Sequence, residues 1–188
     1  MVPLYTFKLE LGGATFRNYA AIVKSGVPAG TVGSKIMRSY PRHEVRRIKD
    51  RARYDRSDAY AIVDAGFLAH VGFCIDGQPF VIPMLYARDG DTLVLHGSIA
   101  SRLLQQLDGG VEACISMTLV DGLVLARSHF HHSANYRSVV AFGRAKAVTD
   151  PAEKSAALAR FVDAMIPGRA GESRAPDRNE LAATLVLR

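Results

Sequence analysis

Short apolar runs separated by Asp-Gly pairs characterise the middle of the chain. Three such runs cover residues 67–75, 78–87 and 92–97, and the pairs Asp76-Gly77 and Asp89-Gly90 separate them. Asp-Gly readily adopts the positive φ angles of a tight hairpin turn, so this spacing indicates antiparallel hairpins. Runs such as 67–73 are apolar on both alternating faces, which is typical of strands that are covered on both sides.

A second set of apolar runs follows the first. It covers residues 111–120, 123–130 and 137–148, with Asp121-Gly122 between the first two. Six short strands so close together predict a closed sheet. We therefore expect a mainly β fold, a six-stranded antiparallel β-barrel with peripheral helices.

Two segments carry helix signals instead. Residues 55–66 offer Asp55 as a cap, with Gly66 to end the helix and Ile62 and Val63 facing the core. A later helix begins after Asp150, with Pro151 at its first position and Glu153 closing a capping-box-like pattern. Its expected core stripe consists of Leu158, Phe161, Val162, Met165 and Ile166.

The two ends of the chain are less regular. Residues 1–50 show one short strand pattern, at Leu4 to Leu11, followed by a Gly-rich loop. Near the other end we predict a loop over 166–178 and a last strand over 181–188.

Composition narrows the class of protein. The 188 residues suit one domain, and 48% hydrophobic with 22% charged residues is typical of globular proteins. No apolar run approaches the roughly 20 residues that cross a bilayer, and the N-terminus has no export signal, so we expect a cytoplasmic protein without membrane contact. Cys74 and Cys114 lie in strand-like runs and are expected to be free thiols.

The net charge of +6 raises the question of nucleic acid. The basic residues concentrate in 38–56, which lacks interleaved apolar periodicity, and are otherwise scattered. We interpret 38–56 as a solvent-exposed segment that precedes the domain, rather than as a nucleic-acid-binding arm. A basic protein equally suits an anionic cofactor.

The segment 98–109 has a helix pattern directly after a strand. Ser98 stands at the expected N-cap, Gly109 at the end, and Leu103, Leu104 and Leu107 face inward. The helix start would gather free N–H groups, the hydroxyls of Ser98 and Ser101, and the guanidinium of Arg102, which suits a phosphate. The same residues also fit an ordinary helix N-cap followed by a solvent-exposed arginine. The sequence pattern alone does not distinguish a phosphate site from such a cap.

Residues near this junction have two interpretations each. His96 and Gly97 end the preceding strand, where His96 could contact a ligand or be a structural histidine. Pro83 interrupts a good strand pattern, which places it at an edge, a bulge or a close approach by another group such as a flat aromatic ligand. Tyr86 could reach that ligand or belong to the core.

A third group of polar residues lies between two strands. Asn135, Tyr136 and Arg137 suit a planar heterocycle with carbonyl oxygens. His129 and His131 would share a strand face, but no third ligand is near, so we do not predict a metal site. The whole group comprises Arg127, His129, His131, His132, Asn135, Tyr136, Arg137 and Ser138.

Taken together, several segments resemble one known family. The segments HVGF, GQPFVIPMLYARDGD, LHGSIASR, DGLVLARSHFHHSANYRSVVAFGRA and DPAEK occur in this order. They are similar to the flavin-nucleotide-binding branch of the pyridoxamine 5'-phosphate oxidase-like proteins, near the nitroimidazole-resistance-type reductases. The resemblance covers about residues 41–188 and implies a split β-barrel, a homodimer with two FMN sites at the subunit interface.

The resemblance also implies a cofactor site. Main-chain groups of Val81, Ile82 and Pro83 would face the isoalloxazine, and the Ser98 junction would take the phosphate. The residues 135–138 would approach the flavin from the partner subunit. The full set of expected cofactor-binding residues is Val81, Ile82, Pro83, Tyr86, His96, Gly97, Ser98, Ser101, Arg102, Asn135, Tyr136, Arg137 and Ser138.

Two departures limit what the resemblance implies. Residues 1–40 match nothing in the family and form an N-terminal extension to which we assign no role. Relatives usually continue beyond the last strand, so the domain 41–188 is expected to lack C-terminal residues. The groups that a pyridoxamine phosphate oxidase needs for its substrate phosphate are not found, and we do not predict vitamin B6 oxidation.

The resulting functional hypothesis is an FMN-dependent oxidoreductase that acts on a small molecule, with NAD(P)H as a possible reductant. No side chain is a convincing catalytic group, and His132 is at most a proton donor. The alternatives are a non-catalytic flavin-binding protein, a haem-binding or haem-degrading split barrel in which His129 or His131 ligates iron, and a deazaflavin-using reductase.

Overall fold

The computed structural model describes residues 4–11, 14–24, 52–53 and 55–188. Its strands are β1 (Leu4–Leu11), β2 (Ala14–Lys24), β3 (Ala52–Arg53), β4 (Leu68–Ile75), β5 (Gln78–Leu85), β6 (Ala87–Asp89), β7 (Thr92–Ser98), β8 (Ala113–Val124), β9 (Ser133–Gly143) and β10 (Thr184–Leu187). Its helices are α1 (Arg56–Ala65), α2 (Arg102–Asp108), the 3₁₀ helix η2 (His129–His131), α3 (Pro151–Met165), α4 (Arg169–Glu172) and α5 (Arg178–Ala183).

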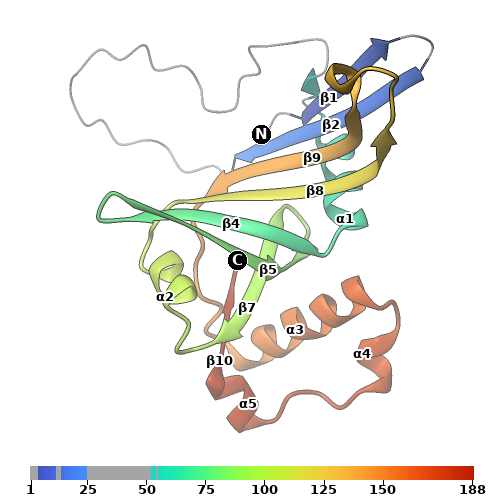
Figure 1. Ribbon diagram of the computed structural model, residues 1–188. Helices are drawn as coiled ribbons and strands as arrows, with labels where there is room; N and C mark the ends of the chain where they lie inside the picture. Colours follow the sequence, from blue (N-terminus) through green and yellow to red (C-terminus); the bar gives the residue numbers. More distant parts are fainter. Residues whose placement is uncertain (1–3, 12–13, 25–51, 54) are drawn as a thin grey trace.

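Most strands belong to one mixed sheet. Its order is β3-β1-β2-β9-β8-β4-β5, so β5 forms one edge (Figure 1). The pairs β4–β5, β4–β8 and β8–β9 are antiparallel, whereas β2 and β9 run parallel. The far ends of β8 and β9 project as an arm, which we define as residues 118–138.

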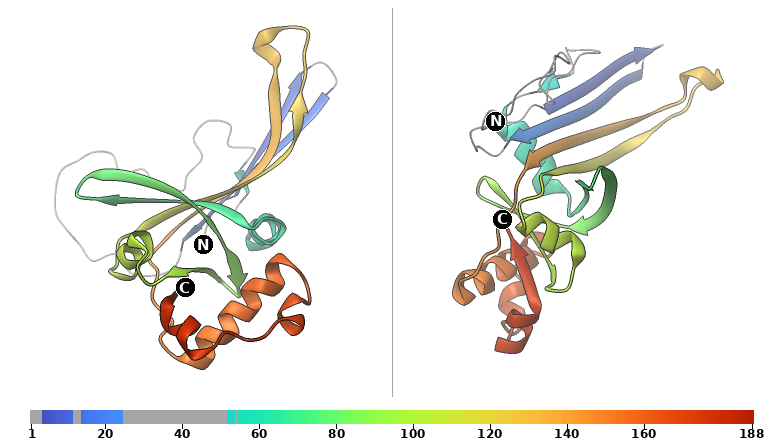
Figure 2. Two further views of the ribbon diagram at one scale, coloured as in Figure 1. Left: turned by 60° about the horizontal axis from the view of Figure 1, so that its bottom comes forward. Right: turned by 90° about the vertical axis from the view of Figure 1, so that its left-hand side faces the viewer.

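A smaller sheet packs beside the first. Its order is β10-β7-β6, and α3 covers it through a cluster that includes Val94, Phe161 and Val186. Figure 2 shows α3, α4 and α5 gathered on the same side of this sheet. The last strand therefore joins β7, which leads directly into α2.

The main core lies between the two sheets, α1 and α2. On β4 the side chains alternate, with Ala69, Val71 and Phe73 buried and Leu68 and His70 exposed. Alternation of this kind is expected of a strand with one covered face. We call the other side the outward face, which carries Leu68, His70, Val81 and Leu85.

The mainly β class and several elements predicted from the sequence are confirmed. Strands form over most of 67–75, 78–87 and 92–97, and β1 forms over Leu4–Leu11. Asp55 stands at the N-cap of α1, although its side chain accepts no capping hydrogen bond. In α3 the Asp150 carboxylate accepts from the Glu153 N–H at 2.7 Å, as expected of an N-cap. The Glu153 carboxylate binds Arg188 and does not close the predicted capping box. Seven strands form within 55–188 and divide between two sheets, where a six-stranded barrel and a further strand over 181–188 were predicted.

The predicted turn at Asp121-Gly122 is wrong. Strand β8 runs through these residues, and its pairing with β9 shifts between Val120 and Gly122. An extra residue in one strand is accommodated as an irregularity of the ladder, so an Asp-Gly pair need not reverse the chain. Consequently the predicted strand 123–130 ends in η2, and β9 begins four residues earlier than predicted.

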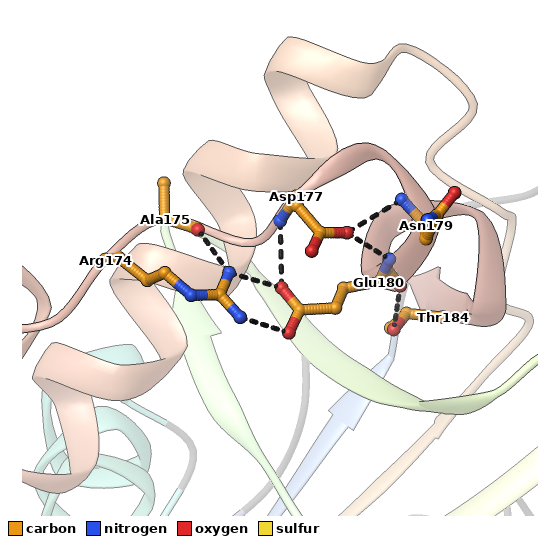
Figure 3. Close-up of polar contacts among 6 residues, drawn as sticks. All are labelled: Arg174, Ala175, Asp177, Asn179, Glu180 and Thr184. Atoms are coloured by element: carbon orange, nitrogen blue, oxygen red, sulfur yellow. Dashed lines mark hydrogen bonds and ion pairs between the residues drawn. The ribbon is translucent and has the colours of Figure 1, made fainter.

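The predicted loop over 166–178 is also wrong. It contains α4 and is followed by α5, which begins with a capping box that the sequence analysis missed: Asp177 accepts from the Asn179 and Glu180 N–H groups, and Glu180 accepts from the Asp177 N–H (Figure 3). The guanidinium of Arg174 holds the other side of Glu180 at 2.6 and 2.7 Å. Strand β10 is therefore only four residues long.

Strands β1, β2 and β3 of the N-terminal region extend the large sheet beyond β9. Strand β2, which the sequence did not indicate, pairs with β1 and β9. The expected Gly-rich loop, most of the basic segment 38–56 and the boundary between residues 40 and 41 lie outside the described residues. Within the described part of the chain, no helix is both long enough and apolar enough to span a bilayer.

Candidate functional site

The junction between β7 and α2 differs from the prediction in one respect. The helix begins at Arg102, and the N-cap is Ser101 rather than Ser98. The Ser101 hydroxyl accepts from the Leu104 N–H at 3.4 Å, whereas the Ser98 hydroxyl accepts from the Ala100 N–H at 3.2 Å within the preceding turn. Strand pairing of Ser98 with Thr184 extends β7 up to this residue and delays the helix.

Both serine hydroxyls keep a proton to donate. A hydroxyl offers one donor besides its acceptor lone pairs, and at Ser98 and Ser101 the described contacts use only the acceptor side. The first amides of α2 have no acceptor within the helix, as at any helix start. Because α2 has only seven residues, we assign little to its dipole. An anion here would be held by hydroxyls, amides and Arg102.

Neighbouring elements fix the shape of this turn. The Ile99 N–H donates to the Ala183 carbonyl at 2.9 Å, and the Gln105 side-chain amide donates to the Ile99 carbonyl at 2.8 Å. Ala183 is the last residue of α5, whose capping box was described above. The helix missed by the sequence analysis therefore holds the loop that precedes Arg102.

Arg102 connects the junction to β5. Its guanidinium carbon lies 5.1 Å from the centre of the Phe80 ring, and that ring stacks on Phe73 at 5.3 Å. The Arg102 side chain is exposed, so its charge is available to a ligand while its stem is positioned by an aromatic face. Phe80 was not among the predicted site residues, because a phenylalanine within a strand pattern is usually predicted to belong to the hydrophobic core.

The next residues of β5 are exposed and lie at an edge of the sheet, as expected of residues that contact a ligand. Val81 is 66% exposed, and Ile82 and Pro83 are exposed too. Among the described residues, strand β5 pairs with β4 alone, which agrees with the expectation that Pro83 lies on an edge. The free edge leaves main-chain groups available to a planar ligand.

His96 and Gly97 lie behind the junction. The His96 ring packs edge-on against Phe161 of α3 at 4.3 Å, and burial lowers the pKa of the imidazole. Its Nδ1 atom is buried and has no hydrogen-bond partner among the described residues. At Gly97 a Cβ atom would meet Leu104 at 3.1 Å, so this glycine lets α2 pack closely on β7.

Tyr86 does not belong to this surface. Its side chain is 1% exposed, and its hydroxyl donates to the Val63 carbonyl of α1 at 2.7 Å. Burial, followed by the nearby Asp64 charge, raises the pKa of the phenol. We therefore remove Tyr86 from the set of cofactor-binding residues and assign it to the core.

Residues Asn135 to Ser138 lie on the arm, away from α2 in every view (Figures 1 and 2). Within one chain, the two predicted polar groups are therefore not brought together. Ser138 is nearly buried, at 9% exposure. The Oδ1 atom of Asn135 is buried without a hydrogen-bond partner among the described residues. A buried orphan acceptor of this kind indicates that another group satisfies it.

Arg137 has a local partner. Its guanidinium binds both carboxylate oxygens of Asp121, with distances of 2.8 to 3.1 Å, and both side chains are about one-third exposed. Asp121 is the residue at the ladder irregularity of β8. Much of the positive charge that the sequence offered to a cofactor is thus compensated within the arm.

The histidines occupy the connection between β8 and β9. His129 and His131 lie in the 3₁₀ helix η2, so the prediction that they share a strand face is wrong. The His132 Nδ1 accepts from the Ala126 N–H at 3.2 Å, which leaves the proton on Nε2. His132 is exposed and belongs to the arm, which lies away from α2 (Figure 1).

Residues 55–188 match the family model of pyridoxamine 5'-phosphate oxidase. The match covers well over half of the chain. The chain belongs to this family. No curated protein sequence matches it.

Two solved structures in this fold family are similar over most of the chain. The first is the FAD and heme binding protein from Mycobacterium smegmatis, with 41% identity and a TM-score of 0.68 over 71% of this chain and 64% of that chain. The second is the flavocytochrome Anf3 from Azotobacter vinelandii, with 42% identity and a TM-score of 0.72 over 79% of this chain and 69% of that chain. The match to the first thus covers less than two thirds of its length.

A third structure shares the fold alone. It is a proposed 5-nitroimidazole antibiotic resistance protein from Bacteroides thetaiotaomicron, with 23% identity and a TM-score of 0.57 over 71% of this chain and 77% of that chain. The family membership and these similarities confirm the split-barrel class and the resemblance drawn from the sequence.

Proposed function

We propose that this member of the pyridoxamine 5'-phosphate oxidase family binds a flavin nucleotide, with the phosphate at Ser98, Ser101 and Arg102 and the ring along the edge of β5. The observation that carries the proposal is the contact of Arg102 with Phe80. It brings the phosphate donors against the residue that directly precedes Val81–Pro83 on β5, although 15 or more residues separate the two groups in sequence. The names of the two more similar structures, which mention FAD or a flavocytochrome, support a flavin.

The site is completed by a second copy of the chain. Asn135 and Tyr136 belong to the part of β9 that forms the arm, and the arm projects away from α2 of the same chain (Figures 1 and 2). The outward face carries exposed apolar side chains, with Leu68, Val81 and Leu85 at 47%, 66% and 40% exposure. Such a contiguous apolar surface beside a site is typical of a protein interface. In a homodimer, the partner's arm would supply the second wall.

A bound flavin would supply the redox chemistry between a reductant such as NAD(P)H and a small acceptor. The chain's own groups bind and orient it. The Arg102 charge offsets part of the phosphate charge, the serine hydroxyls donate hydrogen bonds to the phosphate, and the β5 backbone offers hydrogen bonds to the ring edge. None of the placed side chains is assigned as an acid or base. The enzyme class proposed is therefore oxidoreductase, with no substrate named.

The identity of the nucleotide is tested by titration. The family resemblance indicates FMN, whereas the name of the Mycobacterium smegmatis protein states FAD. The purified chain is titrated separately with FMN and with FAD, and binding is followed by flavin fluorescence and calorimetry. Saturable binding of either supports the site, and the tighter of the two identifies the nucleotide. No binding of either overturns the proposal.

The phosphate contact is tested by substitution. Arg102→Ala should weaken flavin binding about 10- to 150-fold, as expected for loss of a charge-assisted hydrogen bond of about 1.5 to 3 kcal/mol. Arg102→Lys should retain part of the affinity because the charge remains. Arg169→Ala serves as the control, since Arg169 is exposed and pairs with Glu172. An unchanged flavin affinity in Arg102→Ala would show that Arg102 is a solvent-exposed side chain that does not contact the phosphate.

Haem binding is a second candidate function, favoured by the names of the same two structures. Haem needs an axial ligand beside apolar surface. The described residues offer this at two places. His129 and His131 flank the Phe130 ring, which is 88% exposed, and His70 stands on the outward face beside Leu68. The imidazole would ligate iron, and the apolar neighbours would cover the macrocycle.

A spectrum separates these possibilities. The chain is reconstituted with hemin, and the Soret band is compared among the native protein, His70→Ala and the double variant His129→Ala/His131→Ala. Loss of the bound band in the double variant supports ligation from the arm, and its loss in His70→Ala places the ligand on the outward face. A band identical to free hemin in the native protein excludes haem binding.

A further inference from the structure

A pocket of about 230 Å³, open to solvent on one side, lies where β7, α2, β8, β9 and β10 converge. Its wall is formed mainly by aliphatic side chains, among them Leu93, Leu95, Leu107, Ile115, Ala141 and Leu187. An engineered cavity of about 150 Å³ with a similar lining binds benzene, so this one is large enough for a substituted ring.

The proposed flavin site does not account for this cavity. Side chains alternate along β7, so Leu93 and Leu95 face the cavity, whereas His96 and Ser98 face the side of α3 and the phosphate junction. Arg102, Val81 and Pro83 are not among the cavity's lining residues. The cavity is a separate feature on the other face of the strand.

The rim of the cavity carries three charged residues, Asp91, Arg144 and Arg188. Asp91 is compensated, since Arg56 binds it at 2.6 Å and the Tyr60 hydroxyl donates to it at 2.5 Å. Arg188 pairs with Asp89 and Glu153. Two of the three rim charges therefore have opposite charges beside them.

Arg144 differs from its neighbours at the rim. Its guanidinium donates to the Gly110 carbonyl, and no carboxylate within the described residues forms an ion pair with it. The Nε atom of Arg188 is buried and has no hydrogen-bond partner among those residues. An uncompensated cation and an orphan donor thus stand at the mouth of an apolar chamber. This combination suits a ligand that has an anionic group at one end and an apolar remainder.

We propose that the cavity binds a small carboxylic acid with an apolar body, the carboxylate at Arg144 and Arg188 and the body among Leu93, Leu95 and Leu107. An aryl carboxylate fits both the volume and the charge. The proposal does not depend on flavin, because no residue is shared between the two sites.

The probes are 4-ethylbenzoate and its neutral counterpart 4-ethylbenzamide, titrated into the full chain by calorimetry. The carboxylate should bind saturably, and the amide should bind at least about tenfold more weakly because the charge-assisted contact is missing. Arg144→Gln should bring the carboxylate down to the level of the amide without changing amide binding. Arg144→Lys, which keeps the charge, should retain most of the difference.

Two cavity-filling variants test the location. Ala141→Leu places extra carbons in the chamber, and Ala145→Leu does so nearer its mouth in case the first variant folds poorly. Each should abolish binding of both probes while flavin affinity stays unchanged, and a rise in melting temperature would fit a filled cavity. Absence of saturable 4-ethylbenzoate binding, equal binding of the amide, or full binding in both filled variants would overturn the proposal.

Discussion

The hydroxyl of Tyr86 donates a hydrogen bond of 2.7 Å to the carbonyl of Val63, which joins the start of β6 to the last turn of α1. Both residues are almost fully buried. A second bond reinforces the connection, since the Tyr86 N–H donates to the Phe67 carbonyl at 3.0 Å. Tyr86 therefore marks the point at which the large sheet, α1 and the small sheet meet.

Replacing Tyr86 by Phe should lower the free energy of unfolding by about 1 to 2 kcal/mol, because the buried Val63 carbonyl loses its donor while the ring still fills the core. Urea unfolding followed by circular dichroism measures this change. Flavin affinity should stay within twofold of the native value. A large loss of affinity with unchanged stability would instead place the hydroxyl in the binding site, as one interpretation of the sequence had it.

Tyr86 also illustrates which features of the fold a sequence specifies. Local signals located β4, β5, β7, α1 and α3, because hairpin turns and helix caps act within a few residues of the chain. The role of a buried tyrosine depends on which carbonyl lies opposite its hydroxyl, here 23 residues away. No local pattern contains that information.

The arm shows the same limit more sharply. Asp121-Gly122 is an excellent turn signal, yet β9 continues to pair past it and the Asp121 side chain binds Arg137. Pairing over the whole length of two strands outweighs the preference of one dipeptide. The order of strand β7 followed by helix α2 could be predicted because its parts are adjacent, although the N-cap is Ser101 and not Ser98. Phe80 and α5 reach this junction only through the tertiary fold.

Phe80→Leu should weaken flavin binding about two- to fivefold, since a cation–π contact at an exposed site contributes about 0.5 to 1 kcal/mol. Leucine keeps the apolar volume that packs on Phe73, so stability should change little. The measurement is a double-mutant cycle in which Phe80→Leu and Arg102→Ala are combined and flavin affinities compared. If Phe80 acts by positioning Arg102, its effect disappears in the Arg102→Ala background. Additive effects would show that the two side chains act independently.

Acid should weaken the C-terminal helix through Glu180. Hydrogen bonds from Arg174 and from the Asp177 N–H lower the pKa of Glu180 from its ordinary value of 4.5 to about 2. Because the folded state favours the ionised form, its stabilising contribution is complete above about pH 4.5 and is lost as the pH falls toward 2. Glu180→Gln should therefore melt at a lower temperature than the native chain at pH 6, and the difference should shrink steadily on acidification.

A matched variant identifies the cause of that pH dependence. Arg174→Gln removes the guanidinium contact drawn in Figure 3 but leaves the capping box in place. It should show part of the Glu180→Gln effect at pH 6. Melting temperatures of Glu180→Gln that run parallel to those of the native chain from pH 6 to pH 3 would contradict a coupled carboxylate.

Sites built from two subunits can be complemented in mixed dimers. Arg102→Ala removes the phosphate contact and Asn135→Ala removes the arm's orphan acceptor, so each homodimer should bind flavin weakly at both sites. In a heterodimer of the two variants, one site receives both substitutions and the other receives neither. Random assembly of two-fold symmetric dimers from equal amounts of the two variants should therefore recover about a quarter of the native flavin sites.

The experiment counts tight flavin sites in the purified heterodimer. The two variants are co-expressed with different affinity tags, and the heterodimer is isolated by sequential purification on both tags. One tight site per heterodimer is expected, and none would show that Asn135 and Arg102 serve the same subunit's site. Native flavin affinity in the Asn135→Ala homodimer would show that the arm does not contact the flavin.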